Sequence, residues 1–153
     1  MSPFSIVIGE ILSDLEEPLM SVFYVQIGNE CFPDNQWTDL SVSILGFWMN
    51  NIIRNYNSLN SEYDLYFMDG PYAIHIKQDN DILSMNTTKL FSKMWNQNES
   101  IQITKHELLS AIKDALSDLK ILINQDKDCR IKYADSLSTI DSYITTIRFY
   151  LSM

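Results

Sequence analysis

The sequence predicts an α+β fold in which one antiparallel sheet packs against helices. In the first half of the chain, short runs alternate polar with apolar residues, which is the period of a strand. The turns between these runs are too short for the crossovers that parallel strands need. In the last third, apolar residues recur three and four positions apart, which is the period of a helix. The chain has 153 residues, of which 46% are apolar, and these values fit a single domain over residues 1–153.

Two strands and a hairpin are predicted near the N-terminus. Residues 4–11 and 21–27 are rich in β-branched and aromatic side chains, which favour strands. Gly28 and Asn29 suit a two-residue hairpin turn, and they lead into a short strand over residues 30–32.

A helix and a meander of strands are predicted next. The helix ends at Tyr56 and begins at Asp39 or, if the alternating residues 40–44 are extended, at Ser43. With the earlier start, Asp39 is the expected N-cap. The strands are expected at residues 63–68, 72–77 and 82–87, with weaker strand patterns at 90–95 and 101–103.

An antiparallel pair of helices is predicted for the C-terminal third. Thr104 and Glu107 have the spacing of a capping box, in which each side chain binds the backbone amide of the other residue. One helix follows this box, a polar connection over residues 124–128 ends it, and a second helix begins near Tyr133. The complete prediction is a sheet of about five to six strands packed against one internal helix and this pair. The predicted core residues are Trp37, Trp48, Phe67, Ile112, Leu119, Leu137, Ile144 and Ile147.

Motifs for catalysis, cofactor binding and metal binding are not found. His106 and Glu107 begin like the helix of a zinc protease, but Ser110 occupies the place of the second histidine. His75 is expected on the polar face of a strand. Two scattered histidines and two cysteines offer no metal-ligand cluster. The remaining enzymatic alternative is a small hydrolase whose acidic groups would be Asp34, Asp39 or Asp69.

The charge of the chain is distributed unevenly. The net charge is −9, and residues 1–53 carry −7 of it because they contain seven acidic residues and no basic residue. This balance argues against binding to nucleic acid or to an anionic membrane. It favours a solvated surface that keeps the protein soluble, or a surface that attracts a basic partner. The residues predicted to bind such a partner are Asp14, Glu16, Glu17, Glu30 and Asp34.

A second acidic surface is predicted on the C-terminal helices. Its acidic residues are interleaved with Lys113, Lys120 and Lys132, so its charge has mixed sign and suits solubility better than attraction of a basic partner. The acidic residues concerned are Asp114, Asp118, Asp135 and Asp141.

Four segments of the chain resemble a known family. They are Cys31-Phe32-Pro33, Trp37-Thr38-Asp39, Trp48 and Phe67-Met68-Asp69-Gly70-Pro71-Tyr72. This series is similar to a family of small bacterial proteins associated with polymorphic-toxin and contact-dependent growth-inhibition loci. In that setting such proteins are viewed as immunity proteins, so the resemblance implies binding to a toxin domain. It covers residues 20–80 and implies no functional residue, because the shared positions are of structural types.

These patterns together predict a cytoplasmic, non-enzymatic immunity protein that needs no cofactor and neutralises a cognate toxin, for example a nuclease with a basic surface. The first apolar stretch is interrupted by Glu10 and has no basic residue before it, so no signal peptide is expected. No window reaches the ~18 apolar residues of a membrane span. The alternative is an acidic adaptor or structural subunit of a housekeeping complex, and the neighbouring genes discriminate between the two.

Overall fold

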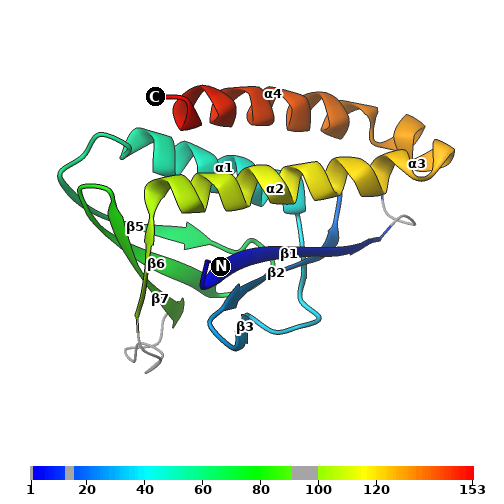
Figure 1. Ribbon diagram of the computed structural model, residues 1–153. Helices are drawn as coiled ribbons and strands as arrows, with labels where there is room; N and C mark the ends of the chain where they lie inside the picture. Colours follow the sequence, from blue (N-terminus) through cyan, green and yellow to red (C-terminus); the bar gives the residue numbers. More distant parts are fainter. Residues whose placement is uncertain (1, 13–15, 91–99) are drawn as a thin grey trace.

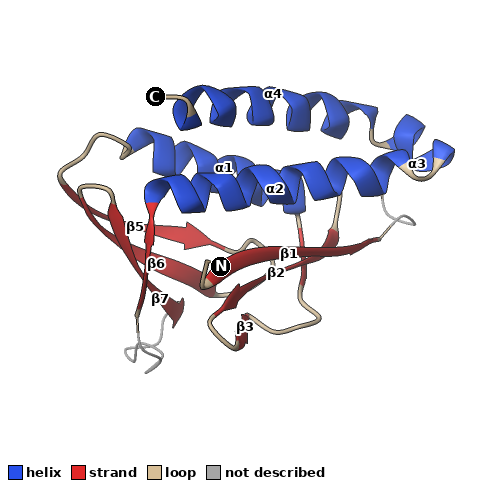
Figure 2. Cartoon of the chain, viewed as in Figure 1, coloured by secondary structure: helices blue, strands red, loops and turns tan. Residues whose placement is uncertain are grey.

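The computed structural model describes residues 2–12, 16–90 and 100–153, which form two antiparallel sheets beneath a layer of helices (Figure 1). Sheet A contains β1 (Phe4–Ile11), β2 (Ser21–Ile27), β3 (Glu30–Phe32) and β4 (Thr38–Asp39). Sheet B contains β5 (Asn60–Tyr66), β6 (Tyr72–Asp79), β7 (Ile82–Lys89) and β8 (Ile101–Thr104). The helices are α1 (Ser41–Arg54), α2 (Lys105–Asn124), α3 (Lys127–Lys132) and α4 (Ala134–Leu151), and all lie on one side of the strands (Figure 2).

The α+β class and the antiparallel pairing are confirmed, but the prediction of one sheet with five to six strands is wrong. The strands divide into two sheets of four, and α1 lies between them in the chain. The outer edge of β5 is covered by α1, because Trp48 Nε1 donates to the carbonyl of Tyr66 at 2.8 Å and Asn51 Nδ2 donates to the carbonyl of Asp64 at 3.3 Å. Carbonyls that already have partners do not pair with a further strand, so sheet B ends at β5.

Sheet A is built around β2. Strand β1 pairs with one edge of β2, while the short strands β3 and β4 share the other edge. The two-residue turn between β2 and β3 is confirmed, with Ile27 opposite Glu30. Gly28 in this turn has φ 59°, a left-handed conformation that glycine adopts without steric penalty.

Several predicted boundaries differ from the observed ones. The strands at residues 4–11, 21–27 and 30–32 are confirmed. The strand predicted at 63–68 begins three residues earlier than expected, at Asn60, and ends at Tyr66. Strands β6 and β7 each extend two residues beyond their predicted ends. Of the weak strand predicted at 90–95, residues 91–95 lie outside the described residues.

The helical third follows the sequence pattern closely. The capping box is confirmed, since the amide of Glu107 donates to Thr104 Oγ1 at 3.1 Å and the amide of Thr104 donates to Glu107 Oε1 at 3.2 Å. Helices α2 and α4 run antiparallel and pack together (Figure 1). The connection predicted as polar chain instead contains α3, whose N-cap is Asp126.

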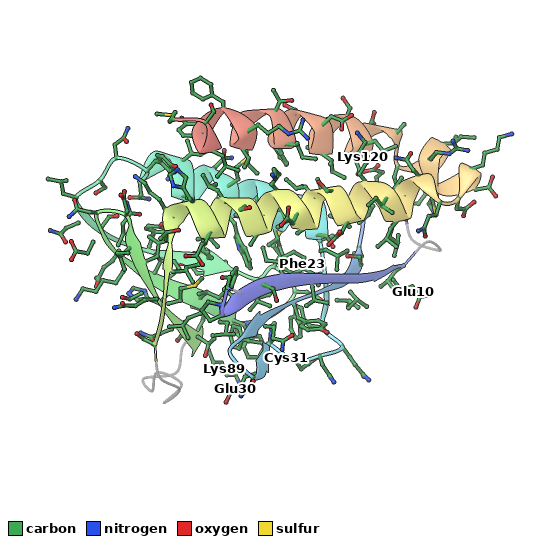
Figure 3. The ribbon with its side chains drawn as sticks, viewed as in Figure 1. Glu10, Phe23, Glu30, Cys31, Lys89 and Lys120 are labelled. Carbon is green, nitrogen blue, oxygen red and sulfur yellow. The ribbon has the colours of Figure 1, made fainter. Side chains whose placement is uncertain are left out.

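A continuous hydrophobic cluster joins both sheets to the helices. Phe23 of β2 lies between sheet A and α2 (Figure 3), and its ring packs edge-to-face on Trp48 at 5.5 Å and on Phe67 at 6.0 Å. Six of the eight predicted core residues are buried, while Trp37 and Leu137 are only partly buried.

Candidate interaction surface

Asp39 joins the two sheets. Its side chain is fully buried, and Oδ2 accepts hydrogen bonds from Trp37 Nε1 at 2.9 Å and from the amides of Met68 and Asp69 at 3.1 Å each. Oδ1 accepts from the amide of Leu40 at 2.8 Å. The prediction of Asp39 as a helix N-cap is therefore wrong: the N-cap of α1 is Leu40, which makes no side-chain cap bond, and Asp39 instead holds the turn that follows β5. Four converging N–H donors satisfy the carboxylate without a counter-ion.

Aromatic rings pack around the same junction. Trp37 and Tyr72 meet edge-to-face at 5.3 Å, and Phe32 packs on Phe67 at 5.5 Å and on Tyr72 at 5.7 Å. A Cβ on Gly70 would lie 2.6 Å from the indole of Trp37, so a side chain there would displace the ring. These residues are the ones that carry the resemblance, and the structure gives them a packing role between the two sheets.

The polar face of sheet B carries a histidine among carboxylates. His75 lies opposite Asp64, and its Nδ1 is 2.8 Å from Asp64 Oδ1, while its Nε2 is 3.9 Å from Glu62 Oε1. The hydroxyl of Tyr66 donates to Asp64 Oδ2 at 3.4 Å, and burial together with the charge of Asp64 raises the pKa of that hydroxyl. His75 was predicted on a polar face without these partners, although the spacing of Glu62 and Asp64 in one strand could have indicated them.

The structure describes four of the five residues predicted to bind a partner, and Asp14 lies outside the described residues. Glu16, Glu17, Glu30 and Asp34 are all exposed. Glu16 and Glu17 precede β2, whereas Glu30 follows it, so a strand of seven residues separates the two groups. That length is roughly 23 Å. The four described residues do not form one compact patch, and their role in binding stays a prediction.

Glu17 also has a structural contact. Both of its carboxylate oxygens accept from Ser136 Oγ, at 3.0 and 2.9 Å. Ser136 lies in the first turn of α4, where a negative charge interacts favourably with the helix dipole. Substitutions of Glu17 therefore affect the attachment of the β1–β2 connection to α4 as well as the surface charge.

A second group of carboxylates lies along α2. Glu107, Asp114 and Asp118 are seven and four positions apart, which places them on one stripe of the helix. Burial and the nearby charge of Asp114 raise the pKa of Asp118. Lys120 lies away from this stripe, toward α4 (Figure 3), where it pairs with Asp141 at 2.7 Å. Lys120 therefore does not neutralise this stripe, although the interleaved sequence predicted a surface of mixed charge.

Two kinds of site, metal-ligand clusters and membrane-spanning helices, are absent from the described part of the chain. Within residues 2–12, 16–90 and 100–153, no group of three or more His, Cys, Asp or Glu side chains is arranged to hold a metal ion. None of the helices in these ranges is both long and apolar enough to span a membrane. Cys31 and Cys129 are free thiols, the first exposed and the second buried. Comparison with protein-family models, with curated proteins and with solved structures gave no match for this chain.

Proposed function

We propose that this protein is a cytoplasmic, non-enzymatic immunity protein that binds and neutralises a basic toxin domain through an acidic surface. The observation that supports the proposal most strongly is the exposure of the acidic residues in a segment without any basic residue, residues 1–53. Of the acidic residues that the structure describes there, only Asp39 is buried. The exposed ones are Glu10, Glu16, Glu17, Glu30 and Asp34.

Charge complementarity gives this arrangement a physical role in inhibition. A nuclease toxin needs a basic surface to hold phosphates, and a carboxylate-rich protein competes for that surface. Long-range attraction raises the association rate, and a few buried contacts then lower the dissociation rate of the complex.

Co-expression with the toxin domain encoded next to this gene tests the proposal. Cells that produce the toxin alone should stop growing, and cells that also produce this protein should grow normally. A stable complex should be isolated from the protected cells. The proposal fails if the neighbouring gene encodes a metabolic enzyme and no complex forms, and an adaptor role then becomes the better explanation.

Reversal of the predicted acidic pair should slow association. With Glu16→Lys and Glu17→Lys together, the on-rate for the toxin domain is expected to fall roughly tenfold or more at low salt, because exposed charges steer encounter. Stopped-flow kinetics at two ionic strengths measure this, and the difference from wild type should shrink at high salt.

The matched control is Ser136→Ala, which removes the contact of Glu17 with α4 but keeps both charges. Its on-rate should equal that of the wild-type protein. An unchanged on-rate in the double reversal, combined with a loss when Asp114 and Asp118 are reversed, would assign the contact surface to the helices.

A further inference from the structure

Strand β1 has an outer edge to which no strand is paired in the part of the chain that the structure describes. The amide of Gly28 donates to the carbonyl of Pro3 at 2.8 Å, which fixes which residues of β1 bond to β2. Hydrogen-bonded and non-bonded positions alternate in an antiparallel pair, so Ser5 and Val7 bond to β2. The backbone groups of Ile6 and Ile8 therefore point to the open edge, which can accept a further strand.

A groove runs beside this edge. It lies between β1 and α2, which pack together at the front of the molecule in the view of Figure 1, and its volume is about 230 Å³. Phe4, Ile6 and Ala111 provide apolar lining, and Glu107 and Asp114 provide carboxylates. No lysine or arginine among the described residues lines it.

The carboxylates of the groove belong to a longer stripe. Asp118 continues the line of Glu107 and Asp114 by one more helical turn. Helix α2 and β1 run in roughly the same direction (Figure 1), so the negative charge of α2 extends along β1. A strand added to β1 would point every second side chain toward α2, because strand side chains alternate between faces. Long basic side chains suit these positions, since their apolar stems can cover the groove lining while their charged ends reach the carboxylates.

We infer that the β1 edge and the α2 stripe together form a docking site for an extended segment with lysine or arginine at alternate positions. The segment adds a strand to sheet A, the backbone of β1 supplies hydrogen bonds, and the carboxylates of α2 select the charge of the alternate side chains. That the natural segment belongs to a toxin rests on the proposed function, whereas the site itself is argued from this chain alone.

The probe for the test is an acetylated and amidated peptide of alternating lysine and threonine, eight residues long to match β1. Amide hydrogen exchange of the full chain is followed by NMR with and without the peptide. The amides of Ile6 and Ile8 are expected to exchange about tenfold more slowly near saturation, because the added strand protects them. The amides of Ser5 and Val7 are already bonded to β2 and should change little. A peptide with glutamate in place of lysine should not bind.

Two variants with equal changes of charge test the role of α2. Asp114→Asn combined with Asp118→Asn is expected to weaken binding of the lysine peptide roughly tenfold. The control is Glu62→Gln combined with Asp69→Asn, since both residues are exposed and neither belongs to the groove or to the acidic surface of residues 1–53. Each pair changes the net charge from −9 to −7 by removing two carboxylates, so general charge attraction falls equally in both. The α2 pair should therefore lose clearly more affinity than the control pair.

The outcomes separate this inference from the proposed function. Failure of the lysine peptide to protect Ile6 and Ile8 at millimolar concentration, or equal losses in the two variants, overturns the docking site even if the toxin complex forms and cells are protected. Protection at those two amides, together with no complex with the neighbouring toxin, supports the docking site and overturns the proposed function.

Discussion

Replacement of Asp39 by alanine is expected to lower the free energy of unfolding by about 3–5 kcal/mol. The substitution leaves four N–H donors without their acceptor: the indole of Trp37 and the amides of Leu40, Met68 and Asp69. Asp39 is fully buried, and the four hydrogen bonds that it accepts are partly buried. Urea unfolding followed by circular dichroism gives the free energy and the m-value.

Two further variants sharpen this prediction. Asp39→Asn keeps one oxygen acceptor and turns an NH2 group toward at least one donor, so its loss should be about half as large. Asp34→Ala is the control, because Asp34 is exposed and its carboxylate accepts from only one described donor, the amide of Gln36 at 2.8 Å. It should lose no more than about 1 kcal/mol. Equal losses for Asp39→Ala and Asp34→Ala would contradict the junction role of Asp39.

Replacement of Trp48 by alanine should lower the free energy of unfolding by ~3–5 kcal/mol, the range for removal of a large buried aromatic side chain. The indole is fully buried, packs edge-to-face on Phe23 and Phe67, and donates to the carbonyl of Tyr66 at 2.8 Å. Its loss leaves a cavity in the core and uncovers the edge of β5. Guanidinium unfolding measures the change.

The matched control is the preceding aromatic residue on the same helix. Phe47 is 59% exposed, so Phe47→Ala should change the free energy of unfolding by less than about 1 kcal/mol. Trp48→Phe removes the N–H donor and one of the two indole rings but keeps a large aromatic side chain, so its loss should be smaller than that of Trp48→Ala. A loss below 1 kcal/mol in Trp48→Ala would show that this part of the core collapses around the cavity.

The elements whose signals are local were predictable from the sequence. The β2–β3 hairpin follows from Gly28 and Asn29, and the start of α2 follows from the capping box of Thr104 and Glu107. The role of Asp39 was not predictable, because its donors Met68 and Asp69 are 29 and 30 residues away and only the tertiary fold brings them together. The division into two sheets depends equally on a distant event, the covering of the β5 edge by α1.

The candidate surface was predictable only in its charge. The excess of carboxylates in residues 1–53 is visible in the sequence, but the distance between Glu17 and Glu30 depends on the direction of β2. The stripe on α2 has a helical period that the sequence contains, yet its position beside an open strand edge depends on the packing of α2 against β1. A pattern within one helix or strand can be recognised in the sequence. The placement of two elements side by side is known only from the fold.

The two sheets differ in how far along the chain their contacts reach, and this has a consequence for the order of folding. Sheet B pairs consecutive strands from residue 60 to residue 104, whereas β1 packs on α2, about a hundred residues later in the chain. Closing a long loop loses more chain entropy than closing a short one. The β6–β7 hairpin should therefore gain protection early in refolding, and β1 should dock last. Pulsed hydrogen exchange would show this as protection of the Lys77 amide before that of Val7, because Lys77 pairs with Ser84 seven positions later, whereas Val7 pairs with Tyr24 seventeen positions later. The strand with the open edge is then also the last strand to complete its contacts.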